Sequence, residues 1–190
     1  MQMRALLLGL FLPGLAHAGG VDVLSFEAAS QRWQPIGALA VPSAPPGAGS
    51  DACVNLGFLV DSNGATSAFA VLRAWSSGTV SGENDDPQLD LYARHAAAAV
   101  QTWRFRAAAG NTKRRPVYTQ ATFVFRAQRG ADAALLRARC DVGDLRTHVE
   151  QAYGRKFRRG DLGKGQLDRN RQQYPWQIPE GCARHAGWCD

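Results

Sequence analysis

The chain has no apolar run long enough to cross a membrane. Its longest apolar stretch, residues 5–15, is 11 residues long, whereas a helix that spans the bilayer core needs about 20. Arg4 precedes this stretch and the small residues Ala16 and Ala18 follow it, which is typical of a cleaved secretory signal. We therefore expect residues 1–18 to be a signal peptide, cleavage to follow Ala18, and the product to be periplasmic, with no stable membrane insertion.

The chain is also poor in residues that catalyse reactions. After residue 18 it has three histidines, His95, His148 and His185. It contains no Gly-x-Ser-x-Gly motif of a serine nucleophile, no glycine loop of the kind that binds phosphate, and no carboxylate pair spaced as in glycoside hydrolases. His95 falls in an expected helix, where a solvent-facing side chain is the simplest interpretation. We predict that the protein is not an enzyme and needs no cofactor; an exported hydrolase on an adapted fold is an alternative.

Cysteine is scarce, but the four cysteines that are present are informative. They are Cys53, Cys140, Cys182 and Cys189, all beyond the signal segment. In an exported chain an even number indicates disulfides, because the oxidising compartment lets them persist. Cys182, His185 and Cys189 could instead bind zinc, yet their spacing is not that of a standard zinc knuckle. We predict two disulfides and no metal; four cysteines allow three pairings, between which the sequence alone does not choose.

The chain carries an excess of positive charge, concentrated towards its C-terminus. Lys and Arg (22) outnumber Asp and Glu (16), so the formal net charge is +6, and residues 126–171 hold 12 basic against 6 acidic side chains. A basic surface on an exported protein can meet anionic lipid headgroups, lipopolysaccharide, nucleic acid or an acidic partner. Export argues against nucleic acid, so we predict no nucleic-acid partner, and a solvated surface is the simplest role for any single arginine.

Residues 53–73 have the pattern of a β-hairpin. Apolar side chains alternate along the first strand, with Val54, Leu56, Phe58 and Val60 on one side. Residues 61–64 read Asp-Ser-Asn-Gly, and Asn-Gly tolerates the positive φ that tight hairpin turns need. Residues 66–73 then form a weaker return strand, and residues 75–86, rich in Ser, Gly and acidic residues, form a surface loop.

A helix and a further strand follow this hairpin. Asp86 can cap the helix and Pro87 suits its first turn, after which apolar side chains recur about every 3.6 residues. These side chains are Tyr92, Ala96, Ala99, Val100 and Trp103. We expect Trp103 to lie in the core at the end of the helix. Residues 116–125 form the next strand, which begins at a proline because proline is confined to strand starts or edges.

These elements predict an α+β fold with a small three-stranded antiparallel sheet (β-β-α-β) and a helix packed on one face. Residues 19–51 form an N-terminal segment, with one short strand or helix, and a turn-rich connector, and residues 52–127 form the domain. Residues 128–190 form a basic extension with helices at 131–139 and 144–156 and an irregular, disulfide-stapled end.

The expected topology also bears on the disulfides. If the last strand lies antiparallel to the first, the C-terminal end of the last strand lies beside Cys53. This topology favours a Cys53–Cys140 disulfide and leaves Cys182–Cys189 as a short local one.

One family has a similar order of elements. A hairpin, an alanine-rich helix ending in Trp103-Arg104-Phe105 and a last strand with Phe123-Val124-Phe125 resemble the C-terminal domain of TonB-type energy transducers. The resemblance spans residues 53–125. It implies a domain that binds other proteins and performs no chemistry. In that family the last strand is an edge that receives an extended segment of an outer-membrane receptor by strand addition, in which main-chain hydrogen bonds supply the affinity.

The resemblance also implies where a partner binds. Carried over by position, the partner-binding edge is made of Val117, Tyr118, Thr119, Gln120, Ala121 and Thr122, with Tyr118 and Gln120 facing the partner. The alternative is an edge covered by the chain's own C-terminal extension, an arrangement that prevents aggregation.

The chain lacks the long proline-rich arm and the permanent membrane helix of a transducer. It is therefore predicted to be a periplasmic binding or scaffold module with a protein partner in the cell envelope; a membrane-anchored transducer variant with an uncleaved N-terminal segment is the alternative.

Overall fold

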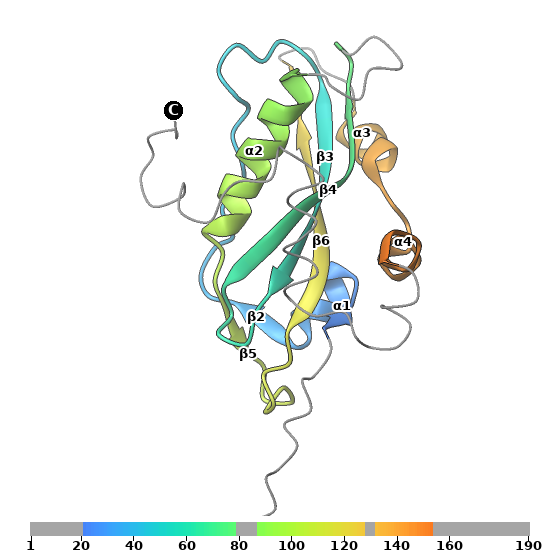
Figure 1. Cartoon of the computed structure of the whole chain (residues 1–190). Coiled ribbons are helices and arrows are strands. Elements are labelled where there is room, and N and C mark those ends of the chain that lie inside the picture. The colour runs from blue at the N-terminus through green and yellow to red at the C-terminus, as the bar shows by residue number, and fades with distance from the viewer. Residues whose placement is uncertain (1–20, 79–86, 128–131, 154–190) are drawn as a thin grey trace, which may run out of the picture.

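The computed structural model describes residues 21–78, 87–127 and 132–153 (Figure 1). The predicted signal segment, Asp86, and the predicted pair Cys182–Cys189 lie outside these ranges. In chain order the elements are β1 (Asp22–Val23), α1 (Phe26–Ser30), β2 (Trp33–Pro35), β3 (Ala52–Val60), β4 (Thr66–Ser76), α2 (Pro87–Gln101), β5 (Phe105–Ala107), β6 (Val117–Phe125), α3 (Ala133–Cys140) and α4 (Leu145–Tyr153).

The main sheet has the strand order β1-β6-β3-β4. The predicted hairpin β3–β4 and the predicted last strand β6 are confirmed, and β3 pairs antiparallel with both neighbours. The α+β class is therefore confirmed, but the expected three-stranded sheet is wrong in strand number. The N-terminal segment adds a fourth strand, β1, parallel to β6, and β2 pairs antiparallel with β5 in a second, small sheet.

The hairpin turn holds the two sheets together. The Asp61 carboxylate accepts hydrogen bonds from the backbone N–H of Asn63 (2.8 Å) and Ala65 (3.0 Å), as expected for a turn that begins with Asp. Gly64 has φ +79°, and a Cβ at this position would lie 1.8 Å from the carbonyl oxygen of Phe105. The N–H of Phe105 donates to the carbonyl of Gly64 (2.9 Å), so the turn and β5 require glycine here.

The first face of the sheet packs against α2 and the tryptophan that follows it. Trp103 is 6% exposed and lies among aromatic rings, with centroid distances of 5.7 Å to Phe58 and 5.9 Å to Phe123. The Trp103 indole N–H donates to the carbonyl of Ala40 (2.9 Å). The prediction of Trp103 as a core residue is confirmed. The helix ends at Gln101, however, before the Trp103-Arg104-Phe105 sequence expected to end it. Trp103 and Arg104 lie between α2 and β5, and Phe105 begins β5, which pairs with β2.

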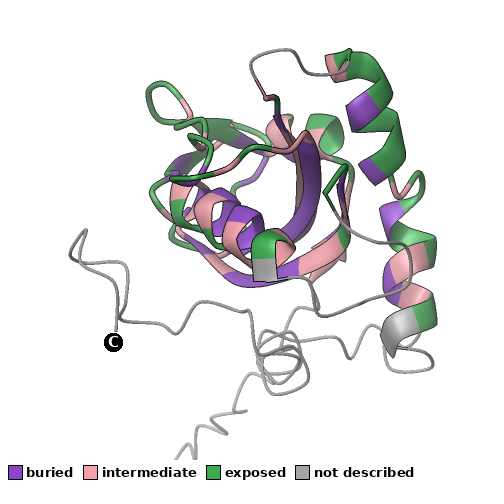
Figure 2. Cartoon of the chain, turned by 90° about the horizontal axis from the view of Figure 1, so that it is seen from above, coloured by how far each residue is buried: buried purple, intermediate pink, exposed green. Residues whose placement is uncertain are grey.

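The second face of the sheet is covered by the C-terminal helices. Figure 1 places α2 on one side of the sheet and α3 and α4 on the other, and Figure 2 shows the sheet curled around a helix with two helices outside. Leu145 and Val149 of α4 form a buried cluster with Leu59 and Tyr118. Helices therefore pack against both faces of the sheet. The two predicted helices are confirmed within the described residues, and the predicted end of the second one, residues 154–156, lies outside them. Gly143 separates the helices with φ +62°.

Each C-terminal helix begins at an aspartate. Asp132 accepts a hydrogen bond from the N–H of Ala134 (2.8 Å), and Asp144 accepts one from the N–H of Arg146 (2.9 Å). The Thr147 hydroxyl also donates to the carboxylate of Asp144, and this bond lowers the pKa of Asp144. The ionised Asp144 therefore stabilises the helix fully at pH values above the ordinary aspartate pKa. This stabilisation is lost as the pH falls through the lowered pKa of Asp144.

One disulfide ties the second layer to the sheet. Cys53 near the start of β3 and Cys140 at the end of α3 are bonded, with a Cα–Cα distance of 5.9 Å and a sequence separation of 87. Cys53 faces Val124 near the end of β6, because β6 runs antiparallel to β3. The predicted pairing of Cys53 with Cys140, and the topology on which it was based, are confirmed.

Candidate functional site

The six residues predicted to bind a partner all lie on β6, but they differ in exposure. Val117, Tyr118 and Thr119 are buried, whereas Gln120, Ala121 and Thr122 are half-buried. Tyr118 is only 2% exposed and packs in the cluster that contains Leu145. The expectation that the Tyr118 side chain faces a partner is therefore wrong, because α4 covers the face of the sheet to which it points.

The first part of the β6 edge is already paired with the N-terminal segment. Asp22 and Val23 of β1 lie opposite Val117 and Tyr118. The N–H of Asp22 donates to the carbonyl of Pro116 (3.3 Å), and the N–H of Leu24 donates to the carbonyl of Tyr118 (3.0 Å). The edge is thus partly covered by this chain. In the described residues the paired segment comes from the N-terminal side, and not from the C-terminal extension that the alternative interpretation named.

The outer edge of β6 continues beyond β1. Backbone groups of successive residues in a strand point to opposite sides, so those of Gln120, Thr122 and Val124 point to the same side as the Tyr118 carbonyl, away from β3. Within the described ranges, no backbone hydrogen bond joins these three residues to another element on that side. We call residues 120–124 the open edge.

Two side chains of the open edge, Gln120 and Thr122, are polar. The side-chain amide of Asn55 in β3 donates to the Thr122 hydroxyl (3.1 Å), which links neighbouring strands across the sheet. The side-chain oxygen of Gln120 is buried and has no hydrogen-bond partner in the part of the chain that the structure describes. A buried acceptor without a partner carries a desolvation cost, and a ligand that supplied a donor would remove this cost.

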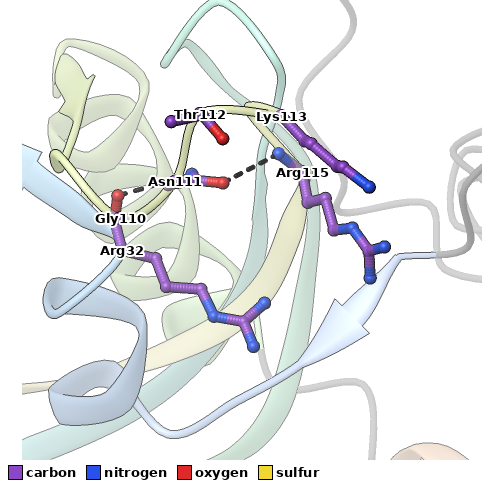
Figure 3. A pocket seen from close by; sticks show the side chains of 6 residues that line it. All are labelled: Arg32, Gly110, Asn111, Thr112, Lys113 and Arg115. Atoms are coloured by element: carbon purple, nitrogen blue, oxygen red, sulfur yellow. Dashed lines mark hydrogen bonds between the residues drawn. The ribbon is translucent and has the colours of Figure 1, made fainter.

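A second candidate site lies in the loop before β6. A pocket of about 400 Å³ is lined by Arg32, Gly110, Asn111, Thr112, Lys113 and Arg115 (Figure 3). No sequence pattern predicted this pocket. The run of charges at residues 113–115 was the available signal, but Arg32 lies far away in sequence and comes next to this loop only through the pairing of β2 with β5.

The described residues contain no cluster of metal-binding side chains. Across residues 21–78, 87–127 and 132–153, no group of three or more His, Cys, Asp or Glu side chains could hold a metal ion. His95 is half-buried in α2, where a solvent-facing side chain was expected. The expectations that the protein is not an enzyme and binds no zinc stay predictions.

Comparisons with protein-family models, with curated proteins and with solved structures find no match for this chain. The resemblance of residues 53–125 to TonB-type C-terminal domains therefore stays a prediction. None of the helices in the described residues is long and apolar enough to cross a membrane.

Proposed function

We propose that the protein is a periplasmic protein-binding module of the TonB C-terminal type, which receives an extended segment of an envelope protein at the open edge. The observation that carries the proposal is that β1 pairs with β6 only at Val117 and Tyr118, while β6 continues to Phe125. Residues 120–124 thus have outward backbone groups on an ordered strand. An ordered strand with an unpaired outer side is the feature on which strand addition depends.

The geometry supports an incoming strand that extends the row occupied by β1. Gln120, Thr122 and Val124 each offer one N–H and one C=O on the outer side. β3 and the Cys53–Cys140 disulfide hold β6 from the inner side, so binding does not have to order this strand first. The half-buried side chains of the open edge would supply specificity, since alternate side chains of an added strand contact alternate positions.

Proline variants on neighbouring positions test this proposal. The N–H of Gln120 points outward, so Gln120→Pro is expected to abolish partner binding while the protein stays folded. The N–H of Ala121 points to β3, so Ala121→Pro removes an internal hydrogen bond and is expected to cost about 1–3 kcal/mol of stability. Pull-downs from an envelope extract measure binding, and urea denaturation measures stability.

The pair of variants also defines the result that contradicts strand addition. Recovery of the same partner with folded Gln120→Pro protein would reject the open edge as its binding site. Amide exchange of the isolated protein is the second measurement. If the N–H groups of Gln120 and Thr122 exchange as slowly as those of Ala121 and Phe123, the open edge is covered by the chain itself and the proposal fails.

The proposed periplasmic location rests on residues 1–18, and mass spectrometry of the N-terminus tests it. Protein recovered from a periplasmic extract is expected to begin at Gly19, because Ala16 and Ala18 form the cleavage site. Replacing Ala18 with a bulky residue such as Arg is expected to block cleavage and leave Met1 in the product. An intact Met1 on the unaltered chain, recovered in the membrane pellet, would instead support an anchored transducer.

A further inference from the structure

The pocket beside the loop at residues 110–115 is cationic. Arg32, Lys113 and Arg115 line it, and none of its lining residues is acidic (Figure 3). Asp22, in β1, forms an ion pair with Arg32. No described acidic side chain forms an ion pair with Lys113 or Arg115. Three positive charges and one negative charge therefore meet at the pocket, which leaves a local charge of about +2.

A buried asparagine holds the backbone of two of these cationic residues. Asn111 is 8% exposed, its side-chain amide donates to the Arg32 carbonyl (3.4 Å), and its side-chain oxygen accepts from the N–H of Arg115 (3.1 Å). The indole N–H of the buried Trp33 donates to the Arg115 carbonyl (3.0 Å). The backbone of Arg115 is thus held by two buried side chains and that of Arg32 by one of them, while the side chains of Lys113 and Arg115 are exposed.

The loop also contains a strained residue. Arg114 has φ +46°, a left-handed conformation that residues other than glycine adopt at a cost. Its N–H donates to the Asn111 carbonyl (2.9 Å), and the next residue is held by the Asn111 side chain. This conformation closes the turn between Asn111 and Arg115, two residues that line the pocket. The hydrogen bonds of Asn111 thus keep the turn closed in spite of the strain.

We propose that this pocket binds an organic phosphate monoester. A phosphate monoester carries a charge of about −1.5 to −2 near pH 7 and presents three acceptor oxygens, which matches the local charge. The Arg115 guanidinium can donate paired hydrogen bonds to phosphate oxygens, and the Arg32 guanidinium has donors besides the one that Asp22 accepts. The Lys113 ammonium adds a point charge. A volume of about 400 Å³ lies within the range of pockets for small molecules, so the phosphate is expected to carry an organic group.

The same phosphate chemistry could come from a soluble ester or from a lipid headgroup, and two arms of one experiment distinguish these sources. In the first arm, glycerol 3-phosphate is titrated calorimetrically into the full protein. In the second, the protein is co-sedimented with phosphatidylcholine vesicles that contain or lack phosphatidic acid. Saturable binding in the first arm assigns a soluble ester. Binding only to vesicles that contain phosphatidic acid assigns a lipid headgroup.

Charge-neutral variants test whether the pocket is the site. Arg115→Gln and Lys113→Gln are each expected to weaken binding about tenfold or more, since each removes a charged contact to phosphate. Arg137→Gln is the matched control, because Arg137 is an exposed cation on α3, away from the pocket. It removes the same charge and is expected to leave binding unchanged. Asn111→Ala is expected to weaken binding although every charge is kept, and circular dichroism checks that each variant is folded.

Absence of saturable binding in both arms would overturn the proposal. So would equal weakening by Arg137→Gln and Arg115→Gln, which would indicate attraction to the overall positive charge alone. The site does not depend on the open edge, and Gln120→Pro is expected to bind the phosphate ester normally. Loss of partner binding and loss of phosphate binding are therefore separate results.

Discussion

Replacing Trp103 with alanine is expected to lower the free energy of unfolding by about 3–5 kcal/mol, the usual cost of emptying a large buried aromatic site. The side chain is 6% exposed and contacts rings from three other parts of the fold: Phe26 of α1, Phe58 of β3 and Phe123 of β6. It also holds the Ala40 carbonyl by a hydrogen bond. Its removal leaves a cavity between these elements that local repacking does not fill.

Trp75 provides a matched control for this variant. It lies on β4, is half-buried, and is covered by the guanidinium of Arg139 at 4.2 Å from the ring centroid. Trp75→Ala is expected to cost roughly 1–2 kcal/mol, because less apolar area returns to water and the cation–π contact is weak when exposed. Urea denaturation of both variants gives the comparison. A Trp103→Ala loss below a third of the expected value would contradict the placement of Trp103 in the core.

Removing the Cys53–Cys140 disulfide is expected to have an effect of similar size. The bond closes a loop with a sequence separation of 87, and loss of a loop this long costs about 4–5 kcal/mol in the chain-entropy model, with 2–4 kcal/mol typical of measurements. Alanine is the right replacement at both positions, since both cysteines are fully buried and serine would bury a hydroxyl. Unfolding under non-reducing conditions measures the loss for the double variant Cys53→Ala, Cys140→Ala.

The second predicted pair is the control for loop length. Cys182 and Cys189 are 7 residues apart, so their loss is expected to cost only about 2 kcal/mol in the same model. Non-reducing peptide mapping of the unaltered protein is expected to show both bonds and no free thiol. Stoichiometric zinc in protein purified without added metal would contradict the second disulfide, and equal destabilisation by the two double variants would contradict the loop-length argument.

The sequence by itself was sufficient for the elements whose signals are local. Alternation along residues 54–60, the turn at residues 61–64 and the 3.6-residue period up to Val100 determined β3, the hairpin and α2, because each signal lies within one element. The Cys53–Cys140 bond followed from these elements, since the topology of a hairpin, a helix and an antiparallel strand leaves few places for the strand end.

Only the tertiary structure decided what happens at the edge of β6 and at the cationic pocket. β1 has two residues, too few for a periodic pattern, and its pairing with Val117 and Tyr118 joins segments almost a hundred residues apart. The alternation of side chains along β6 places Tyr118 on one face of the strand but does not determine whether that face is exposed. Tyr118 is a core residue because α4 packs on that face. Arg32 meets Lys113 and Arg115 because β2 pairs with β5. Each of these contacts joins segments that are far apart in the sequence, and its energy depends on both segments. The sequence of one segment alone therefore carries no signal for the contact.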